Sequence, residues 1–412
     1  MGICISKTCC ICKPKRAKVS IDPESKEKVS ETKNVIAHSA KEVSVKQVEG
    51  VFMNENEEEK SPVKETQEGS FWDLSGLNSF VNHITVLNES KMCFSMNKVL
   101  KIYTIGGDTC LEFPHPKQVN YALPISFDET TKSYQKVATC CRDGIVRIFT
   151  IPDTDSPFET GSEITLEGHT LSVTSCAADK ASKMLATGGR DYQTLLWDLN
   201  TNKQIRSSEI ERNMVTSMKW IPGTDTFLQA SEDLHLRIFD TRDNSSETFD
   251  QPLKTNIGDS FAQTLDITQD GYYCVTGHSP NYAVKLWDLR MMEASADILP
   301  VFTDEDSEFG VVATHFWENS NNNFIISCSK DGLVKAHNFE GAIQSSHNIE
   351  ENDCDGQKIP QNIACMVLLP VTSQEYFSKL PKSSLPIITC SSAQKLQLFG
   401  LCPKDLKFTV YS

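Results

Sequence analysis

The first seven residues place two acylatable groups close together. Removal of Met1 leaves the free amine of Gly2, and Ser6 is the hydroxyl residue that N-myristoylation signals carry at this position. Cys4 follows Gly2 at the spacing of dually acylated proteins. We therefore expect a myristoyl amide on Gly2 and palmitoyl thioesters on one or more of four thiols, those of Cys4, Cys9, Cys10 and Cys12.

A basic group directly after these cysteines supplies a further membrane signal. One myristoyl chain binds a bilayer only weakly, at roughly 10⁴ M⁻¹, so a stable anchor needs a second lipid or a cluster of cations. Each cation near an anionic leaflet contributes about 1 kcal/mol, and the cations here are Lys13, Lys15, Arg16 and Lys18. These features predict a cytoplasmic protein that is peripheral on the cytoplasmic face of a membrane.

The composition changes at about residue 71. Residues 13–70 are rich in Lys, Glu, Ser, Val and Thr and lack Trp and Tyr, so they cannot bury enough apolar surface to offset the entropy of ordering. Residues 1–70 are predicted to be a disordered tether, with the acylation signal in residues 1–18. From Phe71 onward, short β-rich runs alternate with Asn, Asp, Gly and Pro, which predicts many short antiparallel strands in residues 71–412.

Charge and cysteine usage narrow the class of protein. The net charge of −15 argues against a nucleic-acid-binding surface, which would be basic. Outside the N-terminus the cysteines are scattered, many within strand-like runs such as Val137–Cys140 and Ile326–Cys328. We expect these to be reduced thiols that serve as small core residues in a cytosolic protein.

The clearest internal repeat begins at Gly168-His169 and ends at Trp197-Asp198. Within it, Asp191 precedes the terminal aromatic Trp197 by six residues. The same spacing recurs in three weaker copies, Asp143 with Phe149, Asp233 with Phe239 and Asp331 with His337.

Three further units lack this spacing. One ends at Trp287, but there Asn281 replaces the Asp, and Thr276 stands one residue too far upstream. Fainter units end at Tyr103 and Phe399. The sequence therefore predicts seven repeats in total.

The Gly-His and Trp-Asp pairs of the clearest repeat resemble those of the WD40 family, which implies an all-β, seven-bladed propeller. In that family the matching positions form a hydrogen-bonded tetrad that joins the three inner strands of a blade. The chemistry suits this role, because a carboxylate accepts from imidazole and a hydroxyl can link imidazole to indole. The tetrad here would be His169, Thr187, Asp191 and Trp197.

The tetrad is incomplete elsewhere. In the fourth repeat Glu211 stands at the His position and Gln229 at the Thr position, so stability must come mainly from strand packing and ring closure. We expect one terminal segment to complete the blade at the other end of the chain. The candidates are residues 71–74 and residues 406–410, and the sequence does not choose between them.

Residues Ile164 to Phe316 resemble one WD40 member associated with cilia and intracellular trafficking. The resemblance rests on Asn213–Thr216 with Trp220–Pro222, on Gln229–Asp233, and on the endings Phe239–Arg242 and Trp287–Arg290. It implies a scaffold that organises protein complexes, with the plasma or ciliary membrane as its location.

The residue before the tetrad Asp points to the upper rim of WD40 propellers. In this chain that position holds Arg142, Arg190, Glu232 and Lys330. Three cations on an acidic domain could bind an acidic peptide or phosphopeptide. They could equally be ordinary solvated turn charges, and both interpretations remain open.

A second surface carries two short Asp-x-Arg boxes. Some WD40 proteins use this box to join a cullin–RING ubiquitin ligase as substrate receptors. The residues that match are Asp240, Arg242, Asp288 and Arg290. The match is short, so this role is the alternative to the scaffold.

No pattern in the sequence indicates catalysis. The His-Asp-Ser groupings fall on tetrad positions, and there is no phosphate-binding or zinc-protease motif. Cys9 and Cys12 form a lone pair without the second pair that zinc requires. His278, His315 and His337 are dispersed and are interpreted as packing or turn residues. We expect no metal, cofactor, small-molecule substrate or nucleic acid, and partners that are proteins and a membrane.

Overall fold

The computed structural model describes the chain from residue 80 to residue 411 with gaps. The acylation signal, the basic group and the expected tether all lie outside the described residues. The described ranges are 80–104, 110–152, 162–210, 212–242, 248–249, 252–292, 299–305, 309–318, 323–352, 358–360, 362–370, 384–392, 396–402, 404 and 406–411.

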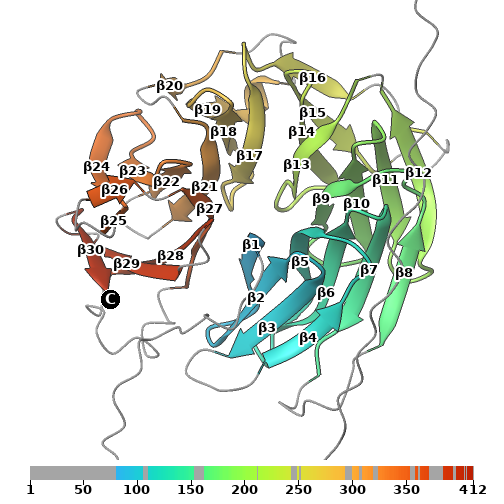
Figure 1. Ribbon diagram of the computed structural model, residues 1–412. Coiled ribbons are helices and arrows are strands. Elements are labelled where there is room, and N and C mark those ends of the chain that lie inside the picture. Colours follow the sequence, from blue (N-terminus) through green and yellow to red (C-terminus); the bar gives the residue numbers. More distant parts are fainter. Residues whose placement is uncertain are drawn as a thin grey trace, which may run out of the picture. The chain divides into compact units, whose positions relative to one another are not determined.

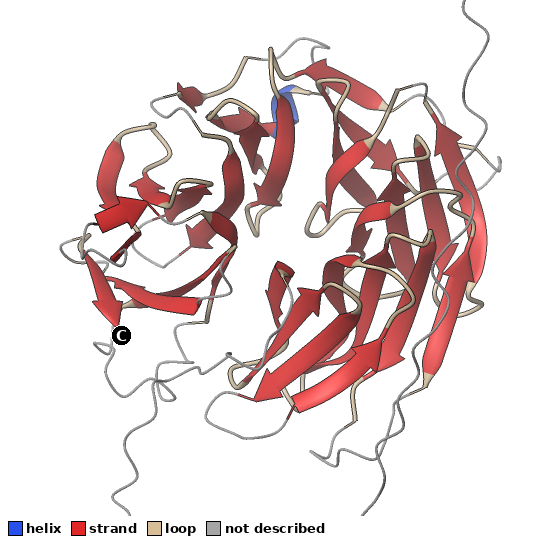
Figure 2. Cartoon of the chain, in the orientation of Figure 1, coloured by secondary structure: helices blue, strands red, loops and turns tan. Residues whose placement is uncertain are grey.

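The described residues form seven four-stranded antiparallel sheets, each made of strands that are consecutive in sequence (Figures 1 and 2). Blade 1 contains β1 (Val81–Val86), β2 (Lys91–Met96), β3 (Val99–Thr104) and β4 (Cys110–Pro114). Blade 2 contains β5 (Val119–Asp128), β6 (Ser133–Cys141), β7 (Ile145–Thr150) and β8 (Glu163–Glu167). Blade 3 contains β9 (Val173–Ala178), β10 (Met184–Gly189), β11 (Gln193–Asp198) and β12 (Lys203–Glu209).

The remaining blades follow the same order. Blade 4 contains β13 (Val215–Trp220), β14 (Thr226–Ser231), β15 (His235–Asp240) and β16 (Leu253–Asn256). Blade 5 contains β17 (Phe261–Ile267), β18 (Tyr273–Ser279), β19 (Val284–Asp288), the 3₁₀ turn η2 (Leu289–Met291) and β20 (Phe302–Asp304). Blade 6 contains β21 (Val311–Glu318), β22 (Asn323–Ser329), β23 (Leu333–His337) and β24 (Ile343–Asn348). A two-stranded hairpin of β25 (Glu350–Asn352) and β26 (Lys358–Pro360) leads into blade 7, which contains β27 (Ile363–Leu368), β28 (Leu385–Ser391), β29 (Leu396–Leu401) and β30 (Phe408–Tyr411).

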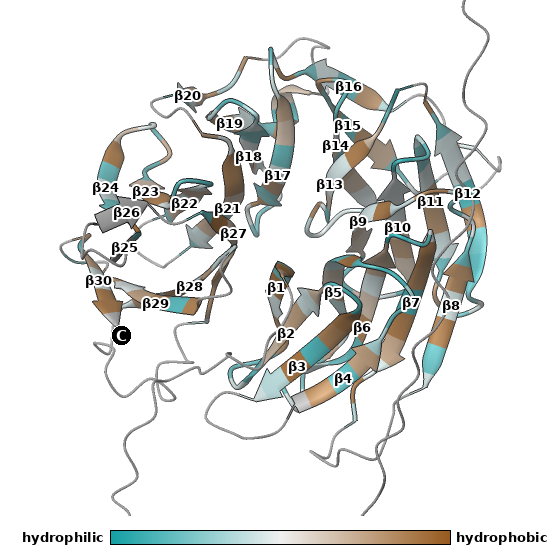
Figure 3. Ribbon diagram, in the orientation of Figure 1, coloured by the Kyte–Doolittle hydropathy of each residue, from teal (hydrophilic) through white to brown (hydrophobic). Residues whose placement is uncertain are grey.

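The prediction of a seven-bladed propeller is confirmed. Each residue that was expected to end a repeat lies in the third strand of a blade: Tyr103, Phe149, Trp197, Phe239, Trp287, His337 and Phe399. The first strands β1, β5, β9, β13, β17, β21 and β27 surround the centre, and the fourth strands are at the periphery (Figure 1). Figure 3 shows the interior strand β7 largely in hydrophobic colours and the outer strand β12 largely in hydrophilic ones.

The expectation that a terminal segment completes the blade at the other end of the chain is wrong for the described residues. Strand β30 pairs with β29 of its own blade, and blade 1 has four strands of its own. Residues 71–74 lie outside the described part. The ring closes through side chains instead, because Met92 and Phe94 of blade 1 share one buried cluster with Val367 and Ile388 of blade 7. Burial of apolar side chains between blades 1 and 7 therefore closes the ring, in place of hydrogen bonds from a terminal strand added to the other blade.

Neighbouring blades approach one another most closely at the second strand. A Cβ atom on Gly188 of β10 would lie 2.5 Å from Cγ1 of Val215 in the next blade, and a Cβ on Gly277 of β18 would lie 2.5 Å from Cγ1 of Val311. Only a small residue fits at such a position. The equivalent residue is small and buried in every blade: Ser95, Cys140, Gly188, Ala230, Gly277, Cys328 and Cys390. The expectation of reduced, core-packed cysteines is confirmed for Cys140 and Cys328, which are buried and free.

Side chains on the first strands also tie each blade to the next. Asn82 Nδ2 donates to the Val119 carbonyl oxygen at 2.8 Å, and Asn120 Nδ2 donates to that of Val173 at 2.6 Å. The hydroxyls of Thr174 and Thr216 donate to the carbonyl oxygens of Val215 and Ala262 at 2.6 and 2.5 Å. These four bonds join blades 1 to 5 around the centre, and in each bond the acceptor is a backbone carbonyl in the first strand of the next blade.

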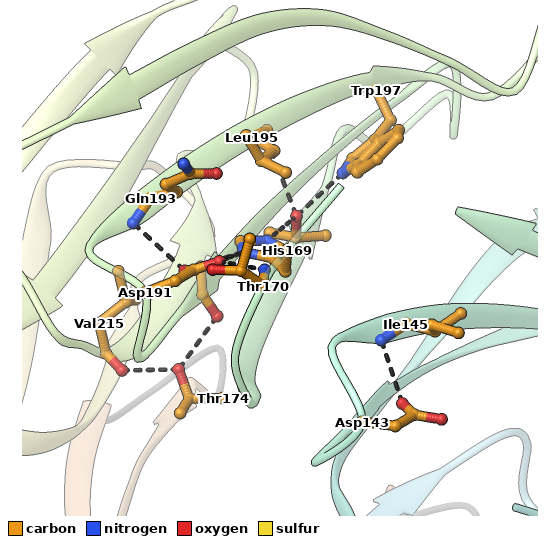
Figure 4. A network of polar contacts seen from close by, with 12 residues as sticks. Asp143, Ile145, His169, Thr170, Thr174, Asp191, Gln193, Leu195, Trp197 and Val215 are labelled. Atoms are coloured by element: carbon orange, nitrogen blue, oxygen red, sulfur yellow. Dashed lines mark hydrogen bonds and ion pairs between the residues drawn. The ribbon is translucent and has the colours of Figure 1, made fainter. Parts of the chain in front are cut away.

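The complete tetrad lies in blade 3, as expected (Figure 4). Trp197 Nε1 donates to the Thr187 hydroxyl at 2.9 Å, and that hydroxyl lies 2.9 Å from His169 Nε2. His169 Nδ1 is 2.9 Å from the Asp191 carboxylate, which also accepts from the Thr170 backbone N–H at 2.8 Å. A chain of donors therefore runs from indole through hydroxyl and imidazole to carboxylate. Burial alone would raise the pKa of Asp191, but the hydrogen bond from His169 lowers it below its usual value.

Blade 5 contains a related network that the sequence analysis missed. Trp287 Nε1 donates to the Thr276 hydroxyl at 2.8 Å, and that hydroxyl lies 2.9 Å from His278 Nε2. Thr276 pairs with Lys285 in the same register in which Thr187 pairs with Leu195, so Thr276 holds the tetrad position of the hydroxyl. The one additional residue between Thr276 and Trp287 lies in the turn after β18. Here the imidazole comes from β18 itself, and burial lowers the pKa of His278 to about 4.

In blades 4 and 6 the position of Thr187 is held by Gln229 and Ser327, and charged groups pair beside it. In blade 4, Gln229 donates to Asn213 Oδ1 at 3.0 Å, and Arg237 donates to the same oxygen at 3.1 Å and pairs with Asp233. Glu211, expected at the His position, lies outside the described residues. In blade 6, the buried carboxylate of Asp304 from β20 accepts from Lys335 Nζ and His337 Nε2, each at 2.8 Å. This cluster joins blades 5 and 6 without a tetrad.

We expect Thr187→Val to lower the free energy of unfolding by about 1–3 kcal/mol, because it leaves buried indole and imidazole nitrogens without a partner. Thr389→Val is a matched control, since Thr389 holds the same position in blade 7 but its buried hydroxyl has no hydrogen-bond partner in the described part of the chain. It should leave stability unchanged or raise it. Urea unfolding followed by circular dichroism measures both, and equal losses at the two positions would contradict the role assigned to the tetrad.

Candidate functional site

The four expected rim residues occupy equivalent turns between the second and third strands of their blades. In each turn the backbone N–H donates to a carbonyl in the loop before the first strand, at 2.8 Å from Arg142 to Gln118 and 2.9 Å from Arg190 to Ser172. Glu232 and Lys330 make the same bond to Met214 and Gly310. The backbone of all four residues is therefore fixed, while the side chains extend from the ends of the strands.

The structure brings three of these residues together. Arg142, Arg190 and Glu232 line one hollow of about 430 Å³ at the rim of blades 2, 3 and 4, which we call the rim hollow. Neutral polar side chains form much of its remaining wall, among them Gln118, Ser172, Thr174 and Gln263. Lys330 lies apart from this group, beside the central cavity between the first strands.

The arginines of the rim hollow are available for an anionic ligand. Both side chains are exposed, and among the described residues no carboxylate pairs with either guanidinium. Two guanidinium groups offer bidentate donors that match carboxylate or phosphate oxygens. Glu232 adds one negative charge to the wall, so the hollow favours an anionic group near the arginines and a cationic or neutral group near Glu232.

The Asp-x-Arg boxes lie at the other end of the blades. Asp240 ends β15, whereas Glu232 precedes the same strand. Both boxes contribute to one groove of about 520 Å³, which we call the box groove. It is lined by Asp240, Arg242 and Arg290 of the boxes and by Arg206, Phe249, Leu253 and Tyr272, among others. Each box arginine is committed to its own aspartate: Arg242 Nε lies 3.0 Å from both Asp240 oxygens, and Arg290 Nε lies 2.8 Å from Asp288 Oδ1. The Arg290 guanidinium also stacks on Tyr272, 4.8 Å from the ring centroid.

The central cavity, of about 680 Å³, holds an ionic group that the sequence did not reveal. Lys219 Nζ lies 3.4 Å from Asp266 Oδ1, and His315 Nδ1 lies 3.7 Å from Asp266 Oδ2. The Asp266 carboxylate raises the pKa of Lys219 above its usual value. These residues come from three first strands, β13, β17 and β21, so no spacing within one repeat could have placed them together. Nor do the described residues contain any group of three His, Cys, Asp or Glu that could hold a metal ion.

The expected acylation and membrane-binding residues, Gly2 to Lys18, lie outside the described residues, as do Cys9 and Cys12. Within the described ranges, no helix is long and apolar enough to cross a bilayer.

Comparison with known proteins finds a match to the family model for the WD domain, G-beta repeat, over residues 161–198. The chain is 24% identical to the kinesin-like protein KIF21A of Homo sapiens over 56% of this chain and 14% of that protein. It is 32% identical to the ribosome biogenesis protein ERB1 of Chaetomium thermophilum over 28% of this chain and 15% of that protein. It is 27% identical to the protein HIR1 of Cryptococcus neoformans over 28% of this chain and 13% of that protein.

These matches cover about a seventh of each relative's length, and the family model coincides with the blade that holds the complete tetrad. The names of these relatives describe different cellular roles. The chain is a seven-bladed β-propeller that contains a WD40 repeat.

Proposed function

We propose that this propeller is a non-catalytic platform that assembles protein complexes, and that the rim hollow binds acidic, including phosphorylated, peptide segments. The observation that carries the proposal is the pair of exposed guanidinium groups of Arg142 and Arg190 around one hollow without a carboxylate partner among the described residues. This pair of cations contrasts locally with the net charge of −15 of the whole chain. Such a patch attracts anionic partners and repels cationic ones.

We further propose that lipids hold this platform on the cytoplasmic face of a membrane. Support comes from the sequence alone, namely the myristoylation pattern at Gly2, the cysteines from Cys4 to Cys12 and the basic residues that follow. Two lipids, or one lipid with a basic patch, give the stable attachment that one myristoyl chain lacks. The resemblance of Ile164–Phe316 to WD repeat-containing protein thirty-one, which is associated with cilia and intracellular trafficking, favours the ciliary membrane and a role in cilium assembly or trafficking.

A second candidate function is that of a substrate receptor of a cullin–RING ubiquitin ligase. The observation in its favour is that the two Asp-x-Arg boxes meet in one groove, with the Arg242 and Arg290 side chains 71% and 51% exposed. An adaptor could thus reach both arginines at once.

Replacement of both rim arginines, Arg142→Ala with Arg190→Ala, should weaken binding to an array of acidic and phosphorylated peptides by about tenfold or more, because charge-assisted hydrogen bonds contribute about 1.5–3 kcal/mol each. The control, Lys180→Ala with Lys183→Ala, removes the same charge from the turn at the other end of blade 3. An equal loss in both variants, or in neither, would exclude the rim hollow as the binding site.

Gly2→Ala should abolish labelling by a myristate analogue and shift the full chain from the membrane fraction to the soluble fraction. A variant with serine at Cys4, Cys9, Cys10 and Cys12 should keep the myristate label but lose stable membrane association, since one acyl chain is insufficient. Unchanged labelling and fractionation of Gly2→Ala would rule out the anchor.

Arg242→Ala with Arg290→Ala should abolish co-purification of a cullin–RING adaptor with the full chain if the receptor role is correct. Absence of any such adaptor from wild-type purifications would eliminate this candidate.

A further inference from the structure

The floor of the box groove contains a buried arginine that is only partly paired. Arg206 lies in β12 and is 3% exposed. Its Nη1 donates to the Asp240 carbonyl oxygen at 3.1 Å, and its guanidinium carbon lies 5.3 Å from the centroid of the Phe249 ring. Its Nε and Nη2 are buried and have no hydrogen-bond partner among the described residues.

The other buried arginines of the described residues each have a carboxylate partner, which Arg206 lacks among those residues. Arg147 pairs with Asp143, and Arg237, which is also 3% exposed, pairs with Asp233. Near Arg206 the two box aspartates are already engaged by their own arginines. A buried donor without a partner destabilises a folded protein, and a charged donor does so more strongly, so natural chains seldom keep one without a use.

The unpaired atoms have a specific geometry. Nε and Nη2 form one edge of the planar guanidinium, with parallel N–H bonds that match the two oxygens of a carboxylate. The bond from Nη1 to Asp240 fixes the group from the opposite side and leaves this edge unused. The groove above it offers apolar surface from Leu253 and Tyr272, which are 45% and 48% exposed, and from the ring of Phe249.

We propose that the box groove binds a peptide segment of a partner protein in which an Asp or Glu is next to an aliphatic or aromatic residue. The acidic side chain accepts from Nε and Nη2 of Arg206, and the apolar neighbour packs on Leu253 and Tyr272. Because the edge is covered in the empty groove, the acidic side chain displaces the side chains above it. This site does not use the rim hollow, which lies at the other end of the blades, and it depends on Arg206, which is not part of the Asp-x-Arg boxes. An adaptor bound to the boxes would occupy the same groove and compete with the peptide.

A stability measurement separates a binding role for Arg206 from a structural one. Arg206→Met keeps a long apolar side chain at this buried position and removes the charge that is only partly paired, so its Tm should equal or exceed that of the wild type. Arg237→Met is the matched control and should lower the Tm, because it leaves the Asp233 carboxylate without its partner. A Tm loss in Arg206→Met as large as that in Arg237→Met would overturn the proposal.

A binding measurement tests the ligand chemistry. A random-peptide phage library selected on the full chain and counter-selected on Arg206→Met should yield peptides with an acidic residue next to an apolar one. Synthetic copies should bind Arg206→Met and Arg206→Lys at least about tenfold more weakly than the wild type, and should bind Arg142→Ala with Arg190→Ala normally. Peptides without an acid, equal binding to Arg206→Met, or binding only when phosphoserine replaces the acid would each overturn the proposal.

Discussion

Neighbouring blades of this propeller meet so closely at the second strand that the residue there must be small. Where it is glycine, a Cβ atom would lie 2.5 Å from a valine methyl of the next blade. The first strand of one blade can then lie directly against the second strand of its predecessor, and this contact recurs around the ring. The contact also explains why Cys140, Cys328 and Cys390 are fully buried, because a thiol is small and apolar enough for the position.

Because this packing holds the blades together, the polar residue next to the small one can differ in type from blade to blade. The residue before the small one is Thr187 in blade 3, Gln229 in blade 4 and Ser327 in blade 6. The buried polar groups beside this position are paired differently in each blade. In blade 3 the partner is the His169 imidazole, in blade 4 it is an amide with a guanidinium, and in blade 6 it is the Asp304 carboxylate of the preceding blade. Pairing of buried polar groups is the physical requirement, and the tetrad is one of several ways to meet it. Apolar burial between blades carries the fold where the pairing is incomplete.

The same strands that hold the blades together carry binding groups at both ends. The turns between second and third strands present Arg142 and Arg190, while the ends of third strands carry the Asp-x-Arg boxes. The two surfaces differ in electrostatics, because the rim arginines are unpaired among the described residues whereas the box arginines are engaged by aspartates. A platform with two chemically distinct surfaces can hold different partners at once.

The sequence by itself determined the number of blades and the third strand of each. Four repeats share the Asp-to-aromatic spacing, and the other three were recognised from a Trp-Asp ending or from short strand-like runs. The sequence also determined the tetrad of blade 3, whose four residue types and spacing leave little choice of partner. The same reasoning wrongly excluded Thr276 from the tetrad position. One additional residue in the turn lengthens the spacing from Thr276 to Trp287, but the pairing of the two strands is unchanged.

Only the tertiary structure decided how the ring closes, which rim residues share a hollow, and that Arg206 lies beneath the boxes. The rim hollow, the ionic group of Lys219 and Asp266, and the partners of Asp304 each join residues of different blades. Such contacts depend on the angle and separation between sheets, which are set by packing around the whole ring and leave no periodic signal within a single repeat.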